Sequence, residues 1–126
     1  TRFVATEECD ASVEFKNAFV QAEDKDIEII KSPVGMPGRS ISGTFLQEAD
    51  KGKRRPDICE YNCIKSCNPK TTPYCIANAL LSAYNGNLKD GFAFAGINAG
   101  KVKQITTVEN VFTEIQNEHN QEVNNH

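Results

Sequence analysis

Four cysteines lie close together in the middle of the chain and are the side chains best suited to chemistry. Cys59, Cys63, Cys67 and Cys75 follow the spacing C-x3-C-x3-C-x7-C, whereas Cys9 stands apart. If the first three lie on successive helical turns, their thiols share one face. Cys75 is then expected in the first turn of the next helix, where the helix dipole favours a thiolate. Four converging thiolates would hold zinc or an iron–sulfur cluster, so the spacing indicates a metal site.

The same cysteines have two other interpretations. Zinc sites usually show C-x2-C or C-x4-C pairs, so four reduced, partly buried thiols are the first alternative. Two disulfides are the second, and they are disfavoured because the sequence shows no secretion signal. On this basis we expect a cytoplasmic protein.

The other polar side chains do not complete an active site. His119 and His126 lie in a polar tail, whereas a general base needs a fixed position near its substrate. Glu7, Glu8 and Asp10 are typical of a helix start rather than of a catalytic pair. The sequence has no P-loop, nucleophile elbow or zinc-protease motif. We therefore assign no catalytic residue to this chain.

Charge and hydropathy exclude two classes of partner. The net charge is −3 over 126 residues, and a nucleic-acid binder needs a basic field. No window approaches the roughly 18 apolar residues of a membrane span. The basic run Lys51–Arg55 could attract a phosphate or an acidic partner, although such runs are usually solvated loops. Arg39 is expected to pair with a carboxylate or to hold carbonyls of the neighbouring Pro/Gly turn.

The elements that position these residues are short and mostly helical. Apolar side chains recurring three and four residues apart predict about four helices, with one or two short strands, in an α+β unit. We expect Asp10 or Ser12 to cap the first helix. The second helix is expected to open at Ser40 or Ser42 and to end at Gly52.

The second half of the chain carries clear helix boundaries. Pro73 suits the first position of a third helix, and Gly86 suits its end. The apolar, Gly-rich stretch 91–100 predicts a buried, irregular connection. Thr106 and Glu109 have capping-box spacing and predict the start of a last helix.

The length allows one domain and not two. We expect residues 1–116 to form a single unit with a Cys-rich insert at 57–75, followed by a fraying polar tail at 117–126. Strands are expected at 3–5 and 27–31.

Several segments in order resemble the nitronate monooxygenases, formerly called 2-nitropropane dioxygenases, and the related FabK-type enoyl reductases. TRFVATEE at 1–8 resembles the segment after their last barrel strand, and SPVGMPGRS at 32–40 resembles the turn that follows. Residues 74–100 resemble the helix, the Gly-Asn turn and the A-G-x-N-A-G segment near their C-terminus. Residues 107–115 resemble their closing helix. The resemblance runs from Thr1 to about Gln116, and the four-Cys insert departs from the best-known members.

The resemblance implies the C-terminal third of an FMN-dependent TIM (β/α)8-barrel oxidoreductase. In that family the last strand leads to a phosphate site, so Thr1 would contact the FMN phosphate. Ala95–Asn98 would approach the isoalloxazine ring, while the catalytic His and most flavin contacts would lie in strands before Thr1. The expected substrate is a nitronate oxidised with O2 or an enoyl thioester reduced with NAD(P)H. The fragment alone is expected to be inactive.

A second hypothesis belongs to another class of protein. The four cysteines would organise a small metal-binding or interaction module without catalytic activity, whose folding depends on the metal. Apolar faces built to pack on a barrel would otherwise be exposed, so a homodimer or a higher assembly is expected.

Overall fold

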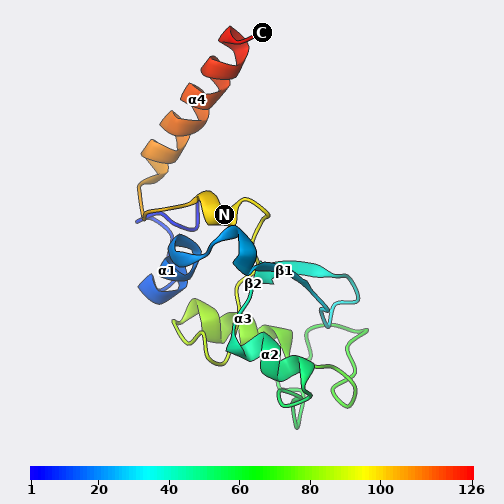
Figure 1. Cartoon of the computed structure of the whole chain (residues 1–126). Helices are drawn as coiled ribbons and strands as arrows, with labels where there is room; N and C mark the ends of the chain where they lie inside the picture. The colour runs from blue at the N-terminus through cyan, green and yellow to red at the C-terminus, as the bar shows by residue number, and fades with distance from the viewer.

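The computed structural model describes all 126 residues as a mostly helical α+β unit with a two-stranded sheet. Figure 1 shows α4 projecting from a body formed by the other elements. The elements in chain order are α1 (Val13–Gln21), the 3-10 turn η1 (Asp24–Asp26), β1 (Ile27–Ile30), β2 (Gly38–Ile41), α2 (Thr44–Asp50), α3 (Ile76–Tyr84), η2 (Ala99–Lys101) and α4 (Val108–Asn124).

The sheet is an antiparallel hairpin of β1 and β2, in which Ile27 pairs with Ile41 and Ile30 with Gly38. The expected strand at 27–31 is therefore confirmed, but β2 was not predicted. The segment after α3 runs beside β2, because Ile41 N–H donates to the Ala93 carbonyl at 3.1 Å and Ala95 N–H donates to Arg39 at 3.0 Å. The irregular connection at 91–100 thus completes the edge of the sheet.

The second helix begins later than its sequence pattern suggested. Ser40 and Ile41 belong to β2, and α2 starts at Thr44 after Gly43, which makes no side-chain cap. The prediction that Ser40 or Ser42 opens this helix is wrong. Hydrogen bonds from a distant segment hold these residues in an extended conformation. Such tertiary bonds outweigh the local preference for a helix that the spacing of apolar residues suggested. Gly52 does follow the helix, with a φ of 74°.

Helices α1 and α3 agree closely with the sequence. Ser12 caps α1, since its hydroxyl accepts from Phe15 N–H at 3.2 Å. Helix α3 ends as expected at Gly86, whose φ is 98°. It begins three residues later than Pro73 suggested, at Ile76, because Tyr74 is drawn into the core.

Helix α4 starts and ends differently from the prediction. Its N-cap is Thr107, not Thr106, and the Glu8 carboxylate accepts from Val108 N–H at 3.0 and 3.1 Å. Thr106 instead forms a parallel bridge with Thr6. This single bridge replaces the strand expected at 3–5, where the chain makes a turn. Helix α4 extends past residue 117 and ends at Asn124.

Two apolar clusters hold the body together. The larger joins α2, α3 and the segments on either side of α3. Its aromatic rings are in contact, since Tyr74 lies 5.4 Å from both Phe45 and Phe92, centroid to centroid. The smaller places Phe19 of α1 against Ala93 and Ala99. Contacts between aromatic rings at these separations stabilise a core beyond the area they bury.

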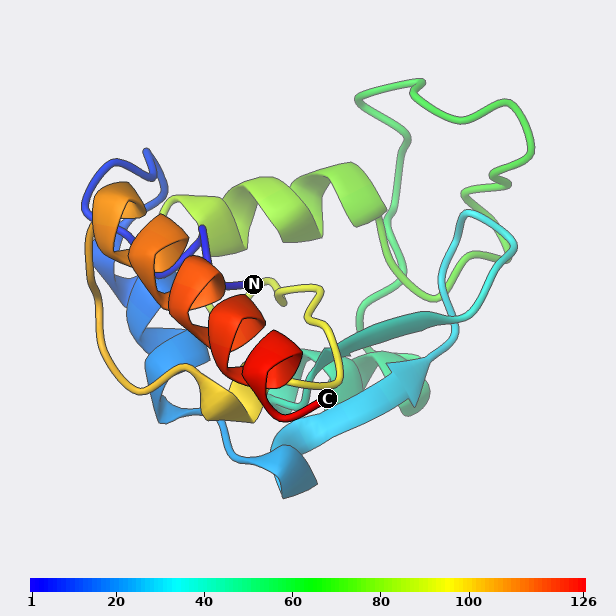
Figure 2. The same cartoon turned by 90° about the horizontal axis from the view of Figure 1, so that it is seen from above.

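Helix α4 and the Cys-rich loop lie at opposite ends of the molecule (Figures 1 and 2). Of the α4 side chains only Val111 is buried. The loop, green in Figure 2, lies beside the turn between β1 and β2 in both views. None of the helices has the length and apolar character needed to cross a membrane.

Candidate functional site

The Cys-rich loop does not have the geometry that the spacing suggested. No helix forms between residues 57 and 75, so Cys59, Cys63 and Cys67 do not share a helical face. Cys75 is the N-cap of α3 and lies outside its first turn. All the cysteines are free, and no three His, Cys, Asp or Glu side chains come together where they could hold a metal ion.

The thiols therefore resemble the reduced-thiol alternative, and the structure gives zinc or an iron–sulfur cluster no support. Cys59 is exposed, and its Sγ accepts from Asn62 N–H at 3.3 Å. Asn62 has a positive φ of 49°, a conformation that asparagine tolerates better than most residues. This bond shapes a local turn instead of converging with the other sulfur atoms.

Thr1 lies against the segment that the sequence resemblance placed near the flavin ring. The Thr1 hydroxyl oxygen accepts from Gly96 N–H at 3.3 Å, across 95 positions of sequence. These two segments are thus brought together, and Thr1 stays exposed. A cavity of about 520 Å³ opens here, between residue 1, the segment around η2 and the foot of α4.

Cations are present on the wall of this cavity. Arg2 Nη2 bonds both carboxylate oxygens of Glu118 at 2.8 Å, and this hydrogen bond raises the pKa of Arg2. Arg2 Nη1 is buried without a hydrogen-bond partner. Lys101 and Lys103 line the same cavity, as does Glu114. We call the cavity lined by Thr1 and these cations the flavin-side cavity, because the sequence resemblance assigns Thr1 to the flavin phosphate. Hydroxyl and cationic donors of this kind suit a phosphate.

Arg54, within the basic run, has a structural role that the sequence did not reveal. Its guanidinium bonds Glu48 at 2.6 Å and Asp90 at 2.7 Å, and it lies 5.1 Å from the Phe45 ring centroid. The bond from Arg54 lowers the pKa of Asp90, with a second contribution from Asn87. Arg54 therefore ties α2 to the turn after α3.

Arg39 and the two histidines have no comparable role. The Arg39 side chain is exposed and makes no hydrogen bond or ion pair, so the expected partner is absent. His126 contacts Glu122 at 2.9 Å on the exposed end of α4, and His119 is also exposed.

Comparison with solved structures identifies the fold. FabK from Thermotoga maritima, a TIM-barrel enzyme, matches with a TM-score of 0.76 and 24% identity over 98% of this chain. A mutant of the same protein matches with a TM-score of 0.71 and 21% identity over 98% of this chain. The matches cover 36% and 34% of those two chains, so this chain spans about a third of their length. The fold is that of one part of a TIM-barrel enzyme.

A family model described as nitronate monooxygenase matches residues 1–118. The chain therefore belongs to the nitronate monooxygenase family, whose members are FMN-dependent oxidoreductases. Both the family and the fold that the sequence resemblance implied are confirmed. No curated protein gives a significant match.

Proposed function

We propose that this chain contributes one wall of the flavin site in an FMN-dependent oxidoreductase, at the end that holds the phosphate. The contact between Thr1 and Gly96 supports the proposal most directly, because it joins the two segments that the family resemblance assigns to the flavin. The family match over residues 1–118 supports the flavin itself.

The residues of the flavin-side cavity fit a phosphate group. The Thr1 hydroxyl accepts from Gly96 and can donate its own hydrogen to a phosphate oxygen. Arg2 has a buried Nη1 without a partner, so an anion bound nearby would satisfy a donor that is otherwise unpaired. FMN, when bound, supplies the redox chemistry, and this chain positions the cofactor and excludes water around it.

Two substrate classes are compatible with this role. One is a nitronate oxidised with O2, and the other is an enoyl thioester reduced with NAD(P)H. Consumption of O2 with a nitronate and oxidation of NAD(P)H with an enoyl thioester are measured separately, so the two assays distinguish the classes. The free thiols support a cytoplasmic location, where cysteines are kept reduced.

Flavin titration tests the proposal. We expect no stoichiometric FMN binding by this chain alone, and a yellow, active protein when it is joined to the barrel segment of the proposed enzyme. In the joined protein, Thr1→Val should weaken FMN binding about tenfold, because one hydrogen bond to a charged group is lost. Thr1→Ser keeps the hydroxyl and serves as the matched control.

Two results would contradict the proposal. Tight, stoichiometric FMN binding by the isolated chain would show that it is not one wall of a larger site. Equal FMN affinity in the Thr1→Val and Thr1→Ser proteins would remove Thr1 from the phosphate site.

A further inference from the structure

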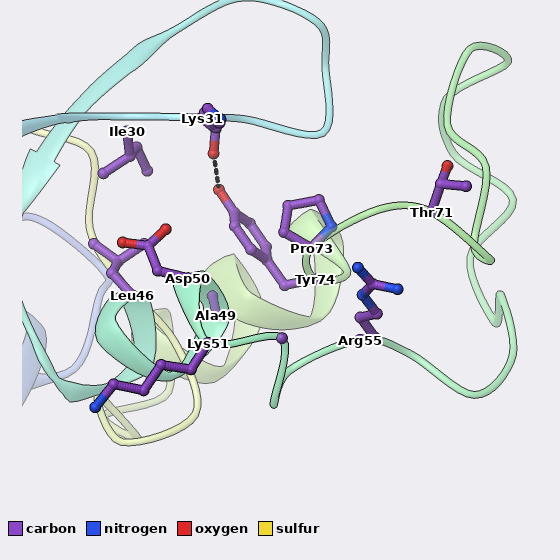
Figure 3. A pocket seen from close by; sticks show the side chains of 11 residues that line it. Ile30, Lys31, Leu46, Ala49, Asp50, Lys51, Arg55, Thr71, Pro73 and Tyr74 are labelled. Carbon is purple, nitrogen blue, oxygen red and sulfur yellow. Dashed lines mark hydrogen bonds between the residues drawn. The ribbon is translucent and has the colours of Figure 1, made fainter.

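A second cavity lies at the other end of the molecule, between the β hairpin, the end of α2 and the end of the Cys-rich loop (Figure 3). Its volume is about 400 Å³, within the usual range of small-ligand pockets. One wall is apolar and is formed by Ile30, Leu46 and Ala49, with Pro73 and Tyr74 beside them. This wall belongs to the larger core cluster, so it is preformed.

Tyr74 fixes the shape of this cavity. Its hydroxyl donates to the Lys31 carbonyl at 3.1 Å, the dashed line in Figure 3, and its ring packs against Phe45 and Phe92. The residue is 2% exposed. Tyr74 thereby fixes the position of the hairpin relative to α2, so the cavity between them is formed by the folded structure.

The charged groups on the cavity are mostly cationic. Lys31, Lys51 and Arg55 line it, and Asp50 is the one carboxylate among the lining residues. None of these four side chains takes part in an ion pair, although the chain as a whole has a net charge of −3. In Figure 3 Lys51 extends outward at the rim, whereas Arg55 lies on the side of Thr71 and Pro73.

Three unpaired cations beside one carboxylate give the cavity a local charge opposite in sign to that of the chain. Arginine and lysine of this kind recognise phosphate, and arginine does so with two parallel hydrogen bonds. Of the apolar wall, Leu46, Ala49 and Tyr74 are buried, whereas Ile30 and Pro73 are half-buried and would remain partly in water if the ligand were a bare ion. An organic anion with a phosphate group and an apolar or planar body would use both surfaces.

We propose that this cavity is a binding site for a phosphate monoester carried on an apolar or planar organic body. Arg55 binds the phosphate, and Lys31 and Lys51 add positive charge around the cavity. The body of the ligand lies along the half-buried side chains of Ile30 and Pro73. This site is separate from the flavin-side cavity, and its existence does not depend on the flavin proposal.

The proposal is tested on the 126-residue chain by following amide chemical shifts during titration with adenosine 5′-monophosphate. Adenosine and inorganic phosphate are titrated in parallel, because they carry only the body or only the charge. We expect the nucleotide to bind most tightly, with shifts at residues 30–31, 49–55 and 71–74, and its affinity to fall as salt is added.

Variants assign the binding to the cavity. Arg55→Gln together with Lys31→Gln should weaken nucleotide binding at least about tenfold, since charge-assisted hydrogen bonds are lost. Lys53→Gln removes a charge from the same basic run at a residue that does not line the cavity, and should leave the affinity unchanged. Asp50→Asn should tighten binding about threefold, the size of one exposed charge interaction, and a misfolded variant would not produce such a gain.

Three results would overturn the proposal. The first is the absence of shifts in the cavity at millimolar nucleotide. The second is equal weakening by Lys53→Gln and by the double substitution, which would indicate attraction by overall charge alone. The third is equal affinity for inorganic phosphate and the nucleotide, which would leave the apolar wall without a role in the ligand. No arm of this test involves flavin, so its failure would not bear on the flavin proposal.

Discussion

At the scale of single residues, the clustering of reactive side chains in the sequence was a poor guide to their roles. The four clustered cysteines are spread along a loop, because the polar residues between them bury too little to pack them together. Thr1 and Gly96 come into contact although neither stands in a distinctive motif of charged or nucleophilic residues. Tyr74, which carries no catalytic pattern, is the largest fully buried side chain.

Tyr74 should make the stability of this protein sensitive to alkaline pH. Burial, with a smaller contribution from Asp50, raises the pKa of Tyr74 from 10.0 to about 12. The unfolded chain therefore loses the phenol proton first, and the contribution of the neutral phenol is present below about pH 10. As pH rises from about 10 to about 12, the free energy of unfolding should fall by up to about 1.4 kcal/mol per pH unit.

Urea unfolding midpoints across this pH range measure the effect. In Tyr74→Phe the fall should be shallower at the same pH values, although the variant is less stable throughout because the bond to the Lys31 carbonyl is lost. Tyr61→Phe changes an exposed ring and should keep the full pH dependence. Identical pH profiles for the two variants would show that Tyr74 does not cause the fall in stability at alkaline pH.

At the scale of elements, the sequence predicted the structure where the signals were local. Helices α1 and α3 have apolar stripes with a cap or stop beside them, at Ser12 and Gly86. Strand β2 was missed because its stabilising partners, around Ala93 and Ala95, lie more than fifty positions later in the sequence. The start of α4 shifted by one residue for the same reason, since Thr106 bonds to the N-terminal turn.

Gly91 shows how closely the elements pack. A methyl group at this position would overlap the Ala79 carbonyl oxygen and lie 2.8 Å from the Ala83 nitrogen, both in the backbone of α3. Backbone atoms cannot move aside as a flexible side chain does, so Gly91→Ala should destabilise the protein by about 3 kcal/mol.

Gly43→Ala is the matched control, because no atom lies within 4 Å of the added methyl group. Gly43 is the N-cap of α2, and its substitution should cost less than about 1 kcal/mol. Chemical denaturation of both variants checks the prediction. Equal stability of the two would mean that the segment after α3 packs less tightly on the helix than the structure indicates.

At the scale of the whole molecule, the two candidate cavities lie far apart on either side of the body. The flavin-side cavity is at the foot of α4, and the anion cavity is beside the Cys-rich loop. The family and the mostly helical fold could be predicted from the sequence, because the motifs occur in order along the chain. The two cavities could not, because their walls come from segments separated by many residues and their volumes depend on tertiary packing.

The exposed face of α4 should make this chain self-associate. Phe112 and Ile115 lie three positions apart on α4, the Phe112 ring is 5.6 Å from that of Phe3, and their exposed fractions are 61%, 40% and 46%. The chain spans about a third of the length of FabK. We propose that a second copy of this chain covers this face of α4, as expected for an uncovered apolar patch.

Sedimentation equilibrium over a range of protein concentrations tests this association. The unmodified chain should shift from monomer to dimer with concentration, and Phe112→Gln should weaken the dimer at least about tenfold, because truncating a central aromatic residue of an interface usually costs more than 1 kcal/mol. Thr113→Gln, on the adjacent exposed position of α4, should leave the association unchanged. A chain that stays monomeric at every concentration, or an equal effect of both substitutions, would show that this face does not drive self-association. Because both substitutions place the same side chain on the same helix, a difference between them reports the loss of the Phe112 ring.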